Sequence, residues 1–399
     1  MTKPIVEAMQ VSSPARPPAT FALWRLGFRP FYLLASVFAA ASVALWTLQY
    51  TGWLTHAYLA GQMAHAHEML FGFTMAVVTG FLFTAVRNWT GRSTPTGWTL
   101  AAIALLWLAG RVLVLTPYGW ASAVVNVAFP IAVAVSIGVP VFQSGNRRNY
   151  FFVGLLALLA LAVAGVHFAQ LGVIALPAWV GIRLALDVIL FIMAVMGGRV
   201  IPMFTNNGVP GAGAKRHAAI ERIALASLLA LLAADVVGVS GVALIALLAV
   251  TAAAHTVRLA LWHPWKTLHT PLVWVLHAAY AWIVVYLALR ALAASEVFPA
   301  PLATHTLTIG AIGMLTIGMM TRTARGHTGR PLVADGYEVA CYLMIFAAAL
   351  VRVFGPVVFP SVYLAGVTLS AILWSGAYGL YAVRYWPVLT RPRLDGKAG

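Results

Sequence analysis

The octapeptide His65-Ala66-His67-Glu68-Met69-Leu70-Phe71-Gly72 opens an apolar segment that runs to about residue 86. It places two imidazoles and a carboxylate at the start of a stretch long enough to cross a bilayer. His305 opens a second apolar segment of the same kind, and a shift of 238 residues superimposes the two. Between residues 67 and 92 the shift gives seven identities without a gap, which are His67/His305, Gly72/Gly310, Gly80/Gly318, Arg87/Arg325 and Thr90-Gly91-Arg92/Thr328-Gly329-Arg330. We therefore predict an internal repeat that relates these two segments.

The composition indicates a membrane protein. Of the 399 residues, 62% are hydrophobic and only 9% are charged, whereas about a quarter of the residues of a soluble domain are charged. The net charge of +16 is explained by Lys and Arg in cytoplasmic loops, so we expect no nucleic-acid partner. The single cysteine, Cys341, excludes an internal disulfide, a four-cysteine iron–sulfur cluster and a covalently attached c-type haem. Any haem would have to be held non-covalently, by histidine.

We predict twelve membrane-spanning helices, because twelve apolar runs reach the roughly 20 residues that a bilayer requires. They lie near 28–49, 63–86, 97–115, 119–142, 151–172, 177–203, 218–236, 240–260, 269–291, 302–321, 334–353 and 359–385. The connections are short, so a single transmembrane domain is expected over 23–388. A disordered cytoplasmic tail over 1–22 would precede it, and a second cytoplasmic tail over 389–399 would follow.

The distribution of positive charge predicts the orientation. With the N-terminus placed in the cytoplasm, 21 of the 25 Lys and Arg residues fall on the inner side, and the exceptions are Arg111, Arg183, Arg290 and Arg352. Such a bias is the positive-inside pattern of polytopic membrane proteins. The expected fold is therefore an all-α bundle with both termini in the cytoplasm.

Ionisable side chains within lipid are costly and mark candidate functional sites. In this topology the segments at 63–86 and 302–321 both run from outside to inside. The histidines that open them therefore share the outer layer with Glu68, and His167 joins this layer from the end of the segment at 151–172. His277 enters its segment from the inside and is expected in the inner half or near the middle.

Two further groups of polar residues carry expectations. Arg183 and Asp187 are four residues apart, so they share a helix face and are expected to pair. The histidines near the inner loop around residue 263 are expected to be solvated, and they are His255, His263 and His269.

A haem held between helices needs a neutral imidazole at the right depth, and a second one if the iron is six-coordinate. His305 can supply one ligand. Residues i and i+2 of a helix point to nearly opposite sides, so only one of His65 and His67 can supply the other. The sequence leaves that choice open. A second haem lower in the membrane would involve His277 and His327.

The motifs resemble those of the NnrS family, and the resemblance covers most of the chain. They are Trp24-Arg-Leu-Gly-Phe-Arg-Pro-Phe31, His65-Ala-His-Glu-Met69, Gly80-Phe-Leu with Asn88-Trp-Thr-Gly-Arg92, Gly197-Gly-Arg-Val-Ile-Pro202, and His305 with Met320-Thr-Arg-Thr-Ala-Arg-Gly-His-Thr-Gly-Arg330. The combination is specific, although the single motifs are not. The resemblance implies a multi-pass protein of the bacterial inner membrane that is associated with nitric oxide stress and denitrification. It also implies haem and copper.

A weaker, architectural resemblance is to the catalytic subunits of haem–copper oxidases and nitric oxide reductases. They too have a twelve-helix core and hold haem through histidines of helices 2 and 10, and Ala64-His65-Ala66 is similar to their helix 2 signature. Their second metal takes ligands from helices 6 and 7. Here those segments offer only Asp187 and, at the inner edge, His217. A second metal would be built differently, from His167, Glu68 or His277.

The expected function is therefore binding of nitric oxide at a haem b in the outer third of the bilayer. His305 and either His65 or His67 would be its axial ligands, with the repeat favouring His67 and the oxidase-like motif favouring His65. Glu68 would be a proton donor or a hydrogen-bond partner of a ligand. Reduction of nitric oxide, in the manner of a haem-dependent oxidoreductase, would require an external electron donor. The alternatives are a transporter of haem, copper or an anion, and a non-catalytic scaffold that protects other metalloproteins.

Overall fold

The computed structural model describes residues 21–397 except for 51 and 54–56, so most of the predicted N-terminal tail lies outside the described residues. Every regular element in the described part of the chain is helical. The elements that shape the bundle are α1 (Phe28–Tyr50), α2 (Gly61–His67), η2 (Glu68–Thr74), α3 (Met75–Thr90), α4 (Gly97–Leu113), α5 (Gly119–Gln143), α6 (Phe151–Gln170), α7 (Trp179–Gly208), α8 (Ala218–Val237), α9 (Gly241–Ala260), α10 (Pro271–Ala294), α11 (Ala300–His305), η5 (Thr306–Gly313), α12 (Met314–His327), α13 (Gly336–Val358) and α14 (Tyr363–Thr390).

Each of the twelve predicted apolar runs coincides with one of these helices or with a continuous series of them. Within the described residues, ten helical segments are long and apolar enough to cross a membrane. The other two predicted spans are α4, which has 17 residues, and α8, which carries three charged residues in its 20. The chain is therefore a multi-pass membrane protein, and the count of twelve spans stays a prediction.

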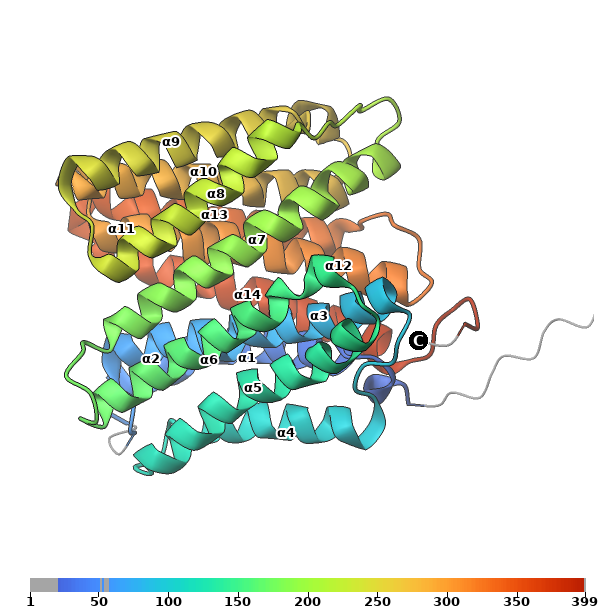
Figure 1. Cartoon of the computed structure of the whole chain (residues 1–399), viewed down its shortest axis with the longest axis horizontal. Helices are drawn as coiled ribbons and strands as arrows, with labels where there is room; N and C mark the ends of the chain where they lie inside the picture. The colour runs from blue at the N-terminus through green and yellow to red at the C-terminus, as the bar shows by residue number, and fades with distance from the viewer. Residues whose placement is uncertain (1–20, 51, 54–56, 398–399) are drawn as a thin grey trace, which may run out of the picture.

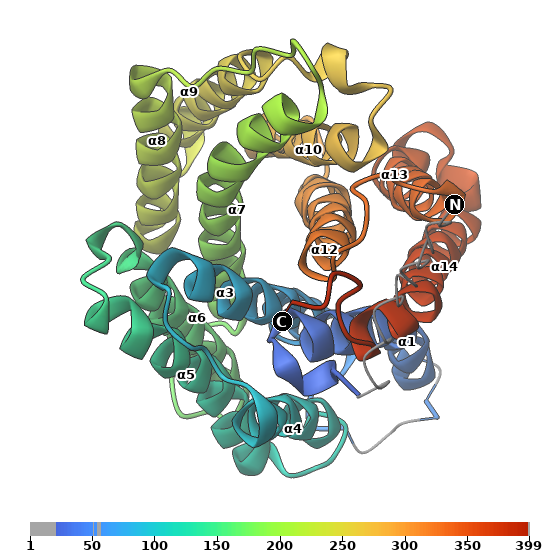
Figure 2. The ribbon, with the colours of Figure 1, turned by 90° about the vertical axis from the view of Figure 1, so that its right-hand side faces the viewer.

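The helices lie side by side along the long axis of the molecule (Figure 1). Seen from one end, α3, α7, α10 and α12 occupy inner positions, while α4, α5, α8, α9, α13 and α14 lie around them (Figure 2). The most buried membrane segments are Gly61–Thr90, Trp179–Gly208 and Ala300–His327. Two of these three are the segments opened by the histidine motifs, so both segments run through the interior of the bundle.

Glycine allows these two central segments to pack closely against their neighbours. A Cβ at Gly72 would lie 2.6 Å from Nη1 of Arg111, and a Cβ at Gly310 would lie 2.5 Å from the indole of Trp282. Neither distance is compatible with a side chain, and small residues are what permit close approach of helices in membranes. Gly72 and Gly310 are also a pair related by the 238-residue shift.

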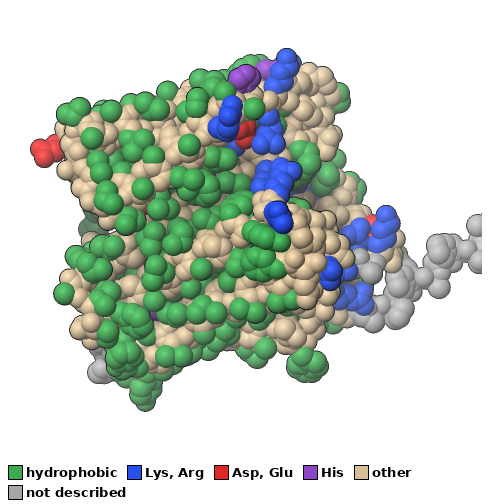
Figure 3. All heavy atoms as spheres, viewed as in Figure 1, with side chains coloured by type: hydrophobic (Ala, Val, Ile, Leu, Met, Phe, Trp, Pro, Cys, Tyr) green, Lys and Arg blue, Asp and Glu red, His purple; other side chains and the backbone are tan. Residues whose placement is uncertain are grey.

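Positive charge is concentrated at one end of the bundle, where Lys and Arg side chains gather on the face drawn in Figure 3. The described chain begins and ends there, since the amide of Ala22 donates to the carbonyl of Thr390 at 2.7 Å. We call this the basic end, and the end that carries α2 and α11 the histidine end (Figure 1). The orientation of these ends in a membrane stays a prediction.

Candidate functional site

The two histidine motifs share an uncommon local structure. The central segment that begins with α2 changes from an α-helix to the π-helical turn η2 directly after His67. The segment that begins with α11 changes to the π-helical turn η5 directly after His305. The first residues of η2 and η5, Glu68 and Thr306, are related by the same 238-residue shift. Single π-helical turns inside α-helices occur frequently at functional sites.

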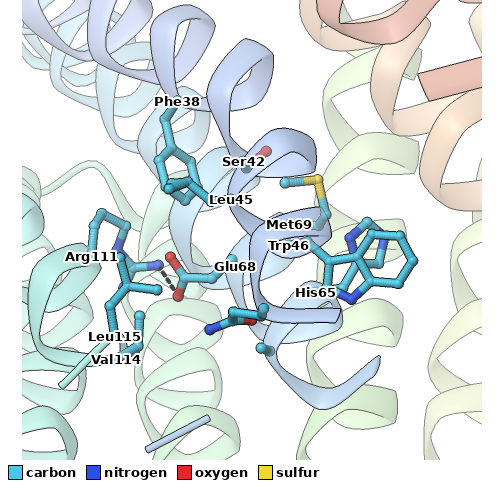
Figure 4. A pocket seen from close by; sticks show the side chains of 12 residues that line it. Phe38, Ser42, Leu45, Trp46, His65, Glu68, Met69, Arg111, Val114 and Leu115 are labelled. Atoms are coloured by element: carbon cyan, nitrogen blue, oxygen red, sulfur yellow. Dashed lines mark hydrogen bonds and ion pairs between the residues drawn. The ribbon is translucent and has the colours of Figure 1, made fainter. Parts of the chain in front are cut away.

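His65 lies beside a small cavity at the histidine end. Its ring packs against Trp46 with centroids 5.4 Å apart. The cavity has a volume of about 30 Å³ and is lined by both of these rings and by Glu68, Met69 and Arg111, among others (Figure 4). Glu68 and Arg111 lie on the opposite side of it from His65 (Figure 4). A space of this size holds one molecule about as large as water.

His305 presents one free nitrogen. Its Nδ1 lies 2.6 Å from the carbonyl oxygen of Pro301, and a carbonyl can only accept. Nδ1 therefore carries the proton, and Nε2 is left with a lone pair. A backbone carbonyl bound to Nδ1 is a common way of orienting a histidine that ligates metal through Nε2.

Arg352 of α13 is the cation whose charge acts on both His65 and His305. Its guanidinium lies over the ring of Tyr363 at 5.9 Å. Its Nη1 is buried and has no hydrogen-bond partner among the described residues. The site therefore contains a cationic donor without an acceptor.

His67 faces a different set of residues. Its Nε2 is 3.2 Å from Nε2 of His167, and its Nδ1 is 2.7 Å from Oε1 of Glu68. His167 continues the row, because its Nδ1 is 3.3 Å from the hydroxyl of Tyr58 and the two rings stack. His65 and His67 thus meet separate groups, as the helical spacing predicts.

An arginine closes the other end of this row. Nη1 of Arg111 donates to Glu68 at 2.8 Å, and its Nη2 donates to the side-chain oxygen of Asn126. Asn126 is itself oriented by a 2.9 Å bond to the carbonyl of Ser122. Helices α2, α4, α5 and α6 and the loop that carries Tyr58 therefore contribute to one continuous chain of polar contacts at the histidine end.

The other predicted ligands lie elsewhere. His277 is buried in α10, where its Nε2 is 2.8 Å from Oγ1 of Thr205 and its Nδ1 has no partner among the described residues. His327 ends α12 and packs against Phe28. It is 22 residues beyond His305, which is about 30 Å along a helix. Within the described ranges, no three His, Cys, Asp or Glu side chains are grouped so that they could hold a metal ion.

The expected Arg183–Asp187 pair is wrong. Arg183 is exposed, while Asp187 lies 3.8 Å from Nη1 of Arg290. Arg290 also donates to Asp235. Asp187 pairs with Arg290 because α10 brings this guanidinium into the interior of the bundle. Arg183, although only four residues from Asp187, is exposed.

The expectation of a solvated His255 is also wrong, since this residue is 0% exposed. Its Nδ1 is 2.6 Å from the hydroxyl of Tyr280, and its Nε2 is 3.1 Å from the carbonyl of Ala224. Arg258, one turn away, donates to Glu221 and to Tyr280, and this network covers the imidazole. His269 is exposed as expected, and His263 is half-buried.

Four residues of the site were not anticipated from the sequence, and they are Tyr58, Arg111, Asn126 and Arg352. The two arginines carried a signal, because both are exceptions to the positive-inside count. An arginine within a predicted membrane-spanning segment is expected to pair with another group or to belong to a functional site.

Comparison with known proteins agrees with this architecture. A comparison with curated proteins finds no match. A family model described as NnrS protein matches residues 22–393, which is nearly the whole chain and includes both histidine motifs. The chain therefore belongs to the NnrS family.

Proposed function

We propose that this membrane protein of the nitric oxide response holds haem b between His65 and His305, at the histidine end. The observation that carries the proposal is the hydrogen bond to Pro301 that leaves Nε2 of His305 unprotonated, together with the buried Nη1 of Arg352, which has no partner among the described residues. Imidazole is a common axial ligand of haem iron. Arginine is well suited to a carboxylate such as a haem propionate, because its donors match the two oxygens.

The residues present fit the group. His305 has a tautomer set by Pro301 that leaves Nε2 free to ligate iron. His65 contacts Trp46 through its ring and forms no hydrogen bond with the described residues, so its nitrogens are available. His67 has contacts at both nitrogens, with Glu68 and with His167. These contacts favour His65 over His67 as the partner of His305.

Polar side chains of the protein would then supply protons beside the haem. A bound haem would supply an iron that can take nitric oxide in place of one of the two imidazoles and that can receive electrons from an external donor. Glu68 lines the cavity beside His65, and Arg111 holds its carboxylate in place. The row Tyr58–His167–His67 ends on that carboxylate, so it can return a proton to Glu68. Nitric oxide is small and apolar, so it can enter from the lipid.

A copper ion, if one is bound, would be held by His67 and His167. Their Nε2 atoms are 3.2 Å apart, and imidazole nitrogen is a ligand that suits copper. Glu68 and Tyr58, which contact the two Nδ1 atoms, would orient both rings as ligands.

We also propose the bacterial inner membrane as the location, with the basic end in the cytoplasm. The gathering of Lys and Arg at that end supports this orientation. The haem would then lie in the outer part of the bilayer, so an electron donor would have to reach it from that side.

The test is the absorption spectrum of the purified protein, expressed with added haem. We expect a Soret band that shifts with nitric oxide, is lost in His65→Ala and in His305→Ala, and remains in His67→Ala. His269→Ala, at an exposed position, is the control. A colourless wild-type protein, or an unchanged spectrum in His305→Ala, would refute the proposal. Turnover of nitric oxide by the reduced protein separates reduction from binding.

A further inference from the structure

Two buried carboxylates share one arginine near the histidine end, in a cluster formed by Asp187 of α7, Asp235 of α8 and Arg290 of α10. The Asp187 and Asp235 side chains are only 5% and 4% exposed. Helices α8 and α10 carry none of the four histidines at that end. Among the described residues, no ion pair of this cluster includes a residue of the candidate haem site.

Charge is not balanced in this cluster. Arg290 contributes one positive charge, through Nη2 to Asp235 and through Nη1 towards Asp187. Two ionised carboxylates would leave one negative charge in the interior of the bundle. Oδ2 of Asp187 and Oδ2 of Asp235 are both buried and have no hydrogen-bond partner within the described residues. Each carboxylate thus has one oxygen available for a further ligand.

Within the described residues, Arg290 is the cation that forms ion pairs with Asp187 and Asp235. From α10, Tyr286 faces the cluster, and its hydroxyl accepts from Arg290 at 3.3 Å. On α7 itself, Arg183 acts on Asp187 electrostatically but is exposed. The titratable residues of α9 are His255 and Arg258, which bind Tyr280 and Glu221. The only one of α6 is His167.

The two unpartnered Oδ2 atoms are better suited to a proton than to a metal cation. A hard metal cation in a protein takes about six or more oxygen ligands, and no group of three metal-binding side chains occurs in the described part of the chain. Asp187 and Asp235 both contact the guanidinium of Arg290, so the two carboxylates are neighbours. Two carboxylates held this close in a dry site do not both ionise, and one proton shared between them removes the repulsion.

We propose that Asp187 and Asp235 form a proton-binding site that holds one proton in the resting protein. The proton leaves the cluster neutral overall, with one carboxylate ionised against Arg290. Since Asp235 is the link from α8 to this cluster, loss of the proton would place repulsion between α7 and α8. Helix α8 would keep its packing against α9 and its Glu221–Arg258 pair near the basic end.

The test uses infrared spectra of the purified protein, without added haem, in H2O and in D2O at neutral pH. We expect the carbonyl stretch of a protonated carboxylic acid in the wild type, with the downshift in D2O that an exchangeable proton produces. Asp187→Asn and Asp235→Asn should each lose this contribution. Asparagine has the shape of the protonated acid, so both variants should fold. Glu296→Gln removes an exposed acid and is the matched control.

Three outcomes decide the proposal. Loss of the band in both aspartate variants, with no change in Glu296→Gln, supports it. A wild-type spectrum without the band, or a band that persists in both variants, overturns it. Sodium chloride is also compared with choline chloride at equal ionic strength, and a band that disappears only with sodium overturns it by showing that the ligand is a metal cation. Because no haem is present, the result is independent of the proposed function.

Discussion

Replacement of Arg352 by leucine separates a role in haem binding from a role in the fold. Nη1 of Arg352 has no partner among the described residues, so its removal breaks no hydrogen bond of that atom. It does remove a cation–π contact with Tyr363 at 5.9 Å, worth about 0.5–1 kcal/mol. It also removes the unpartnered buried donor, which has a cost of about 1–3 kcal/mol. The haem-free variant should therefore be as stable as the wild type or slightly more stable.

Haem binding should respond in the opposite direction. A hydrogen bond from a charged donor to a propionate contributes about 1.5–3 kcal/mol, which corresponds to a roughly 10- to 100-fold change in Kd. We expect Arg352→Leu to weaken haem binding by that factor in a titration followed at the Soret band. The thermal unfolding of the haem-free protein is measured in parallel.

Arg183→Leu is the matched control, because Arg183 is exposed and is also an arginine outside the inner loops. Its haem affinity should equal that of the wild type. An unchanged affinity in Arg352→Leu would refute the propionate contact. A large loss of stability in the haem-free variant would show that Arg352 serves the fold instead.

Three further predictions concern stability. A methyl group at Gly310 would lie 2.5 Å from the neighbouring indole, so Gly310→Ala should lower the free energy of unfolding by about 1–3 kcal/mol. Gly154→Ala is the control and should not lower it, because a methyl group there has no neighbour within 4 Å. Equal thermal stability of the two variants would contradict this prediction. Arg258→Met leaves the partly buried carboxylate of Glu221 with the exposed Arg216 as its remaining ion-pair partner among the described residues, so it should cost about 1–3 kcal/mol. A double variant that also carries Glu221→Gln should recover part of the loss in the same unfolding assay. Although burial opposes ionisation of Asp335, hydrogen bonds from an arginine side chain and from the first turn of α13 lower the pKa of its carboxyl from 3.8 to about 2. The contribution of this carboxylate to the free energy of unfolding is therefore complete above about pH 4 and is lost as the pH falls towards 2. Asp335→Asn should flatten the dependence of stability on pH in this range.

The sequence predicted the helical segments well because hydrophobic length is a local property. Every predicted apolar run became a helix or a helix series, and the two histidine motifs, which were expected in one layer, lie at the same end of the bundle. Helical spacing also predicted correctly that His65 and His67 face different groups. It could not say which of them faces His305, because that depends on how the segment is rotated against α11 and α13.

The failures arose where a distant residue competed with a local one. The spacing of Arg183 and Asp187 was correct for a pair, but Arg290 is 103 residues from Asp187 in sequence and lies beside it in space. Burial of His255 likewise depends on Tyr280, 25 residues further along the chain. Pair partners between helices are set by packing, and one sequence contains no direct record of them.

The two π-helical turns define the direction of the histidines that precede them. A π-helical turn accommodates one residue more than an α-helical turn, so the helix before it is rotated by about 100° relative to an uninterrupted α-helix. His65 belongs to the stretch before η2, and His305 to the stretch before η5. Removal of one residue from either turn would swing the imidazole through about a quarter of the helix circumference, away from its partner. The rotation that each π-helical turn gives to the helix before it therefore determines where the histidine points.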